Sequence, residues 1–303
     1  YSFFSSQFNC SLGFLLGLLF LLSSMSACIP EPVEISIPQL EPSLVVASQI
    51  LGDQIIFVQL SRSFGALEFS ESNGDTLSND FLDQILVDSA RVMVAYRDGV
   101  DTLINIGGGF YVTAFTPLYE GDTYMLSVYD SATGLEAFAQ SEVLPVANWE
   151  NVDYFFEAQS LTFNDTLFTD TVLQIATSWQ DLVGESYYMV NAYKVSLTDN
   201  GDPSDIFFGQ AGPPTYTYSD QLFPNAVITD TIPYTNFQLG DTIAVALSHI
   251  SKGYYEYLTT RQRSATSLFA NLLAEPVNYP TNVDRGYGFF NLHLPSVQLF
   301  ILE

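Results

Sequence analysis

The feature that most constrains the fold is a period-two alternation of apolar and polar residues in short runs. Between residues 44 and 146 there are seven such runs, and Gly- and Asp-containing turns separate several of them. Successive side chains of a strand point to opposite faces of a sheet, so this pattern predicts half-buried strands. Seven short strands with turns between them indicate a β-sandwich over residues 44–146.

Similar runs after Pro145 predict a second β-rich module over residues 150–303. One segment breaks the alternation: Ser251 can cap a helix, and apolar residues then recur every three or four positions up to Leu272. The predicted helix runs near residues 252–273. The predicted fold class is therefore mainly β: two tandem sandwich-like modules, immunoglobulin-like or transthyretin-like, with one main helix.

A short motif links the two modules. Gly121-Asp122-Thr123 and Gly240-Asp241-Thr242 each precede an alternating run. Glycine supplies the positive φ that such corners use, so both motifs predict a turn that leads into a strand. The repeat supports the fold and says nothing about a ligand.

The N-terminal segment predicts export. Residues 1–27 carry no charge, and the apolar run Leu12–Leu22 is shorter than the roughly 20 residues that span a bilayer. It is typical of a secretory signal peptide. Ser26 and Ala27 directly precede Cys28 and resemble a bacterial lipobox, so we expect cleavage before Cys28 and a lipid on that residue. The alternative is an ordinary secretion signal with a chance cysteine. We also expect a basic segment and an initiator Met upstream of Tyr1.

Residues 28–43 form the predicted tether between the lipid and the first strand. Three Glu and four Pro lie between Ile29 and Pro42. Proline fixes φ and removes a donor, which favours an extended and semi-rigid chain. An acidic signal for surface export is the alternative interpretation of this segment.

Composition and motifs exclude several functions. With 8 Lys+Arg against 34 Asp+Glu, the net charge is -26, which argues against a nucleic-acid partner. Both cysteines, Cys10 and Cys28, precede the body of the chain, which excludes a disulfide scaffold, a Cys-based zinc site and a cysteine nucleophile there. No phosphate-loop, serine-hydrolase or zinc-protease motif is present. His249 and His293 are expected to be structural. No cofactor and no enzymatic activity are predicted.

The best cation candidate is a loop with three aspartates. Asp199, Asp202 and Asp205 offer the hard oxygen ligands that Ca²⁺ prefers, but their spacing does not match an EF-hand. A solvated turn is the favoured interpretation, so no metal site is predicted. The polar insertion at residues 68–88 is a second candidate for a functional site, because long loops on a rigid scaffold often contain the binding residues.

Four aromatic residues near the C-terminus allow two interpretations. They are Tyr279, Tyr287, Phe289 and Phe290, and Gly286 and Gly288 lie among them. Glycine in a strand often marks the close approach of another backbone or a ligand. The rings either fill the second module's core or form an exposed recognition surface. We expect most of them in the core, with Tyr287 and Phe289 on one face of a strand.

Several segments along the chain follow a recognisable pattern. They are the lipobox, Leu44–Val46, Val92–Val94, Phe110-Tyr111, Gly121–Leu126, His249–Leu258, Glu275–Val283 and Gly286–Phe290. Together they resemble the Bacteroidota envelope lipoprotein family known as domain of unknown function 4249. Arg285 departs from the pattern, which favours a small residue there. The resemblance implies an outer-membrane lipoprotein, often associated with TonB-dependent transport, and it implies no catalytic residues.

The functional prediction follows from the resemblance and the missing motifs. We expect a lipid-anchored envelope protein that acts as a non-enzymatic binding or accessory subunit, with an outer-membrane TonB-dependent transporter as a partner and the membrane contacted through Cys28. The alternatives are an envelope hydrolase acting on glycan or peptide, and a structural scaffold subunit.

Overall fold

The structure is a computed structural model. It describes residues 41–51, 55–63, 84–163, 166–195, 215–222, 225–235, 237–266 and 278–303. The predicted signal peptide, Cys28, almost all of the tether, most of the 68–88 insertion and the aspartates Asp199, Asp202 and Asp205 lie outside these ranges.

The first sandwich consists of two five-stranded sheets. One has the order β16(Gly286–Phe289), β1(Leu44–Leu51), β2(Ile55–Arg62), β6(Phe110–Thr113), β5(Ile104–Gly107). The other has the order β15(Val283–Asp284), β8(Glu136–Glu142), β7(Thr123–Asp130), β3(Ala90–Tyr96), β4(Gly99–Thr102). Buried and exposed residues alternate along β7, so the period-two prediction is confirmed here. The inward residues of both sheets form one apolar core.

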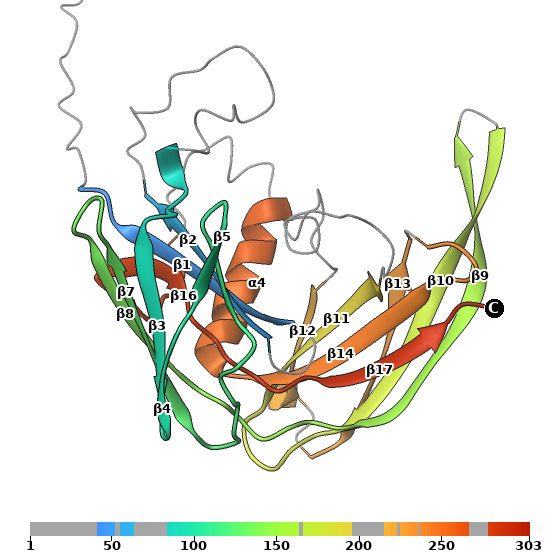
Figure 1. The fold of residues 1–303 in the computed structure, drawn as a ribbon. Helices are drawn as coiled ribbons and strands as arrows, with labels where there is room; N and C mark the ends of the chain where they lie inside the picture. The colour runs from blue at the N-terminus through green and yellow to red at the C-terminus, as the bar shows by residue number, and fades with distance from the viewer. Residues whose placement is uncertain are drawn as a thin grey trace, which may run out of the picture. The chain divides into compact units, whose positions relative to one another are not determined.

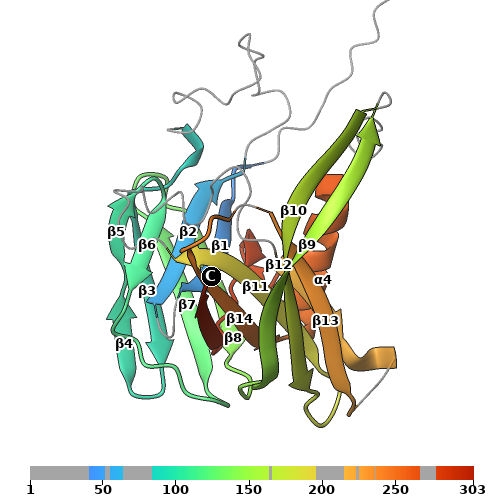
Figure 2. The same cartoon turned by 90° about the vertical axis from the view of Figure 1, so that its right-hand side faces the viewer.

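The second sandwich consists of a three-stranded and a four-stranded sheet. The first has the order β13(Val227–Tyr234), β10(Thr166–Gln180), β9(Trp149–Phe163). The second has the order β12(Thr215–Ser219), β11(Tyr187–Val195), β14(Thr242–Ile250), β17(Ser296–Ile301). Its core surrounds Trp179, whose ring makes edge contacts with those of Trp149, Tyr188 and Tyr218. The hairpin of β9 and β10 continues past the end of β13 (Figure 2).

The two sandwiches share one connectivity. In one sheet of each sandwich the equivalent strands, in chain order, are β1, β2 and β6 of the first and β9, β10 and β13 of the second. In the other sheet they are β3, β4, β7 and β8 of the first and β11, β12, β14 and β17 of the second. This is the Greek-key arrangement of immunoglobulin-like domains. The predicted fold class is confirmed.

The Gly-Asp-Thr motifs occupy equivalent corners of the two sandwiches. Gly121 N–H donates to Val143 O at 2.7 Å, and Gly240 N–H donates to Leu302 O at 2.8 Å. Both glycines have positive φ, 78° and 90°. The shared motif therefore marks a shared turn before β7 and before β14, as the sequence predicted.

The main helix, α4(Lys252–Thr266), follows β14 directly. The amide of Tyr254 donates to Ser251 Oγ at 3.3 Å, so Ser251 caps the helix as predicted. Tyr254 and Leu258 are buried against Tyr187 and Phe289. The predicted helix is confirmed as far as Thr266, and its expected extension to 273 lies outside the described residues.

The segment between β14 and β17 corrects the predicted module boundary. In the first sandwich a short turn joins β7 to β8, whereas residues 251–295 separate β14 from β17. Within this insertion, β16 pairs in parallel with β1 (Figure 1). The short strand β15 pairs antiparallel with β8. Phe290 and Leu292 belong to the first core. Residues 283–292 were predicted in the module 150–303, but they complete the first sandwich.

Two glycines allow this long-range pairing. A β-carbon on Gly286 would lie 2.6 Å from Leu44 O, and one on Gly288 would lie 1.9 Å from Val46 O. Only a residue without a side chain can approach the backbone of β1 so closely. The polar groups that follow β16 are satisfied: Asn291 N–H donates to Ser48 Oγ at 2.7 Å, and Leu292 N–H donates to Ser141 Oγ at 2.8 Å.

Candidate functional site

A groove opens at one edge of the second sandwich. It has a volume of about 720 Å³ and is lined by β12, by the 3-10 helix η1(Asp220–Leu222), by the residues that begin β13 and by Tyr255 of α4. The lining residues that can contact a polar ligand are Thr217, Tyr218, Ser219, Asp220, Gln221, Thr229 and Tyr255. A cavity of this size, with aromatic rings and a few polar groups, is typical of ligand sites.

Local hydrogen bonds form the groove wall at the end of β12. The hydroxyl oxygen of Ser219 accepts from Gln221 N–H at 3.3 Å, which turns the chain into η1. The amide of Asp220 donates to Ser186 O at 3.2 Å and holds η1 against the segment that precedes β11. These bonds place Asp220 and Gln221 side by side at the groove.

Tyr218 connects the two sheets beside the groove. Its hydroxyl donates to Asp230 Oδ2 at 2.5 Å, so a residue of β12 is bonded to a residue of β13. Burial, and then this bond to a carboxylate, raise the pKa of Tyr218 well above its ordinary value. The second oxygen of Asp230 accepts from Thr231 N–H at 2.8 Å. Asp230 is therefore a structural acceptor.

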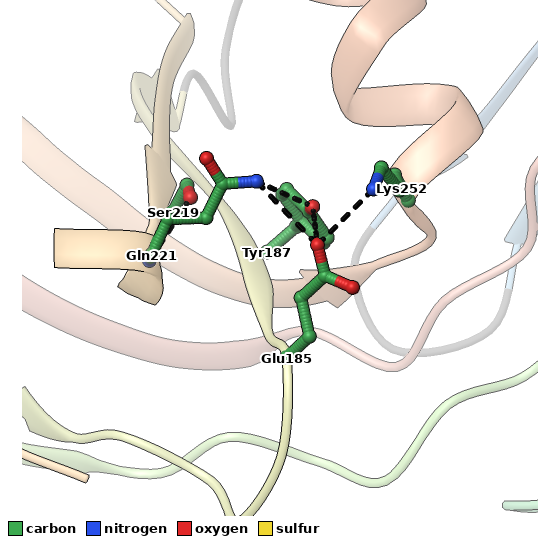
Figure 3. A network of polar contacts seen from close by, with 5 residues as sticks. All are labelled: Glu185, Tyr187, Ser219, Gln221 and Lys252. Carbon is green, nitrogen blue, oxygen red and sulfur yellow. Dashed lines mark hydrogen bonds and ion pairs between the residues drawn. The ribbon is translucent and has the colours of Figure 1, made fainter. Parts of the chain in front are cut away.

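A polar network lies at the rim of the groove (Figure 3). Glu185 Oε1 accepts from Tyr187 Oη, from Lys252 Nζ at 3.1 Å and from Gln221 Nε2 at 3.4 Å. Gln221 Nε2 also donates to Tyr187 Oη at 3.1 Å. The network joins α4 to η1 through Glu185, so it fixes the amide of Gln221 at the groove.

Within this network, Glu185 and Lys252 each stabilise the charged form of the other. The hydrogen bond from Tyr187, and then that from Lys252, lower the pKa of the Glu185 carboxyl. The same contact with Glu185 raises the pKa of Lys252. Lys252 Nζ also lies 6.0 Å from the ring centroid of Tyr187, which is 4.8 Å from that of Tyr255. A cation thus already lies against a tyrosine face and a carboxylate at this rim.

Two further carboxylates lie near the groove and differ in their partners. Asp181 is buried, and its oxygens accept from Tyr188 Oη and from Asn225 N–H, each at 2.6 Å. Asp220 is 3% exposed, and its described hydrogen bond is the one from its amide to Ser186 O. Burial lowers the pKa of His249, whose charged form these two aspartates would favour.

The predicted aromatic residues do not form one surface. Phe290 is fully buried in the core of the first sandwich, and Phe289 is 6% exposed beneath α4. Tyr279 and Tyr287 are 40% and 52% exposed. The two phenylalanines are buried as expected, but neither lies in the core of the second sandwich. Phe290 lies in the core of the first sandwich, and Phe289 packs against α4.

The groove residues were not predicted from the sequence. Asp220, Glu185 and Lys252 belong to different runs, and no motif connects them. Their proximity arises from the pairing of β11 with β12 and with β14. Lys252 lies at the start of the predicted helix, and no sequence pattern connects it with Glu185.

Two features are absent from the described part of the chain. No group of three or more His, Cys, Asp or Glu there is arranged to hold a metal ion. Within the same ranges, no helix combines the length and the apolar character needed to cross a membrane.

These observations define a protein of two immunoglobulin-like sandwiches, the first completed by an insertion from the second. The chain belongs to the family described as "Domain of unknown function (DUF4249)", whose model matches residues 30–295. No curated protein matches the chain. One similar solved structure is a two fibronectin type-III domain segment from chicken tenascin. The identity is 7%, the match covers 69% of this chain and 91% of that one, and the TM-score is 0.21.

Proposed function

We propose that this protein is a lipid-anchored component of the cell envelope that binds a ligand or partner without transforming it. The groove at η1 supports the proposed binding function. It combines the rings of Tyr218 and Tyr255 with the polar residues Ser219, Asp220 and Gln221. Aromatic rings beside a few polar groups are typical of a site that binds a ligand.

The anchor is supported by the sequence at the N-terminus. Ser26 and Ala27 before Cys28, after an apolar run of signal-peptide length, favour lipidation of Cys28. The Pro- and Glu-rich residues that follow would separate the sandwiches from the lipid. The resemblance to envelope lipoproteins favours the outer membrane and an accessory role beside a TonB-dependent transporter.

Cys28→Ser in the full chain, expressed in a bacterium that lipidates exported proteins, tests the anchor. We expect loss of radiolabelled palmitate and a shift of the protein from the membrane to the soluble fraction. Cys10→Ser is the matched control, because Cys10 lies upstream of the predicted cleavage point, and it should leave both unchanged. If Cys28→Ser stays in the membrane fraction and keeps the label, the proposed lipid anchor on Cys28 is wrong.

The accessory role is tested by crosslinking the lipidated chain in intact cells and identifying its partners by mass spectrometry. Enrichment of one outer-membrane transporter over a control lipoprotein of similar abundance is expected. Turnover of an envelope glycan or peptide by the purified chain would contradict the non-enzymatic half of the proposal.

A further inference from the structure

We infer that the outer face of the sheet β15-β8-β7-β3-β4 binds a second copy of this chain, with a twofold axis that runs along β7. This surface belongs to the first sandwich, so the inference goes beyond the proposed binding function and does not rest on the groove of the second sandwich.

The outward side chains of this sheet form an exposed apolar patch. The residues that alternate with them along β3, β7 and β8 belong to the first core, so the sheet has one inner and one outer face. Four large apolar side chains of the outer face are exposed: Val100 by 60%, Met125 by 61%, Tyr129 by 47% and Phe138 by 40%. Apolar side chains gathered on one face mark an interaction site.

The register across β7 makes this face self-complementary in charge. Arg91 of β3 and Glu136 of β8 both pair with Tyr129 of β7, on its two sides. A twofold axis along β7 exchanges these sides, so Arg91 of one copy lies opposite Glu136 of the other, and the contact occurs twice. Within the described chain Arg91 has no ion pair, whereas Arg285 Nη1 donates to Glu136 at 3.0 Å. The dimer therefore gives Arg91 an acidic partner.

The same axis brings apolar side chains together beside the charged pairs. Met93 and Phe138 lie on the two sides of Ser127, so Met93 of each copy lies opposite Phe138 of the other. Met125 follows on the same face of β7 and lies on the axis, where it meets its own counterpart. Methionine adapts its shape to such contacts, and its sulfur packs well against aromatic rings. The interface thus has an apolar centre with ion pairs at its border.

The charge of the face allows two copies of an acidic chain to approach each other. With 8 Lys+Arg against 34 Asp+Glu, two copies repel each other over most of their surface. Three of the eight basic residues lie on this face or at its border: Arg91, Arg97 and Arg285. Repulsion here is therefore weaker than the net charge of the chain implies.

The size of the face predicts a reversible dimer. Three strands about 4.8 Å apart and up to about 27 Å long, with the shorter β4 and β15 at the edges, offer roughly 500 Å² per copy. Specific interfaces bury about 800 Å² per partner, and weaker ones bury less. We expect a dissociation constant of about 1–100 µM, so the dimer should depend on concentration.

Sedimentation equilibrium of the full chain, in a density-matched neutral detergent, tests the inference. The parent should change from monomer to dimer as its concentration rises. Met125→Asp places two like charges on the axis and should weaken dimerisation at least about tenfold. Because Met125 is 61% exposed, this variant should fold like the parent, which circular dichroism checks. Val183→Asp is the matched control: Val183 is 95% exposed in the second sandwich, and the variant should dimerise like the parent.

Mixing two charge variants tests the position of the axis. Arg91→Glu opposes two acids across the interface and Glu136→Arg opposes two bases, so each variant alone should dimerise at least about tenfold more weakly than the parent. In an equal mixture, the altered side chain of one variant faces that of the other, and the two unaltered side chains also pair. Mixed dimers should therefore form nearly as well as the parent dimer. No contact within one chain can produce this recovery.

Crosslinking in intact cells tests the identity of the partner. Met125→Cys adds a thiol on the axis to a chain whose own cysteines are Cys10 and Cys28. A short bis-maleimide should link it to a second copy more efficiently than it links the parent or Val183→Cys.

Four results would overturn the inference. They are a monomer at every concentration, mixed charge variants that dimerise no better than either alone, a Met125→Cys chain that links to itself no better than Val183→Cys, and linkage of Met125→Cys to a different envelope protein. The last result would assign the face to another partner.

Discussion

Gly288 of β16 lies so close to Val46 of β1 that a β-carbon on the glycine would be 1.9 Å from the valine carbonyl oxygen. The two residues are partners in the parallel pairing that joins the C-terminal insertion to the first strand. Gly288 also has a φ of 94°, which L side chains rarely adopt. The pairing of β16 with β1 therefore requires glycine at position 288 for two reasons, the short distance to Val46 and the positive φ.

Gly288→Ala should destabilise the protein by about 3 kcal/mol or more, because the new methyl group must push β16 away from β1. Urea unfolding followed by circular dichroism measures the loss. Gly134→Ala is the control: Gly134 has a φ of 75°, but nothing lies within 4 Å of its ideal β-carbon. Gly134→Ala should lower the free energy of unfolding by only about 1–2 kcal/mol, the cost of a positive φ for a residue with a side chain. Equal losses would mean that the close approach is unimportant.

Phe289→Ala should cost about 3–5 kcal/mol, since it removes a ring buried beneath α4. The Phe289 centroid is 5.4 Å from that of Tyr254 and 5.6 Å from that of Tyr257. Tyr287→Ala, two residues away in the same strand, should change stability by less than about 1 kcal/mol because half of that side chain is exposed. The measurement is the free energy of unfolding. A tolerated Phe289→Ala together with a damaging Tyr287→Ala would contradict this assignment.

Lowering the pH should destabilise the protein through His293. Burial lowers the pKa of His293 to about 4, whereas an unfolded histidine titrates near about 6.5. Below pH 6.5 the unfolded chain therefore binds a proton that the folded chain does not, so stability falls as the pH drops from about 6.5 towards 4. The expected contribution between pH 7 and pH 5 is about 2 kcal/mol.

Urea unfolding at several pH values checks this, with His293→Gln as the variant. The loss between pH 7 and pH 5 should shrink in the variant. His249→Gln is the comparison, because burial also lowers the pKa of His249, and its effect should have the same sign. An unchanged pH profile in His293→Gln would assign the acid sensitivity to other groups.

The sequence predicted those strands along which apolar and polar residues alternate locally, such as β1 and β7. β14 is buried along both faces and follows from its apolar run, and the Gly-Asp-Thr motifs mark equivalent corners before β7 and β14. The helix followed from its spacing and from Ser251. These signals are local, so no knowledge of the partner strands was required.

What the sequence could not predict is which segments pair over a long distance. β16 pairs with a strand more than 200 residues earlier, and local periodicity contains no information about that choice. Alternation placed Tyr287 and Phe289 on one face, yet only Phe289 is buried, because α4 covers it. The groove has the same origin: Gln221 bonds Glu185 across 36 positions, and Lys252 bonds it across 67.

The insertion between β14 and β17 also has a consequence for biogenesis. The first sandwich obtains its edge strands, β15 and β16, and the core residues Phe290 and Leu292 from the insertion between β14 and β17. During synthesis, the two sheets that contain β1 to β8 therefore cannot be complete until residues 283–292 have emerged. Pairings of this kind are slow to form, because the entropy of closing the loop opposes them. The first sandwich is thus exposed to chaperones and proteases until those residues have been synthesised.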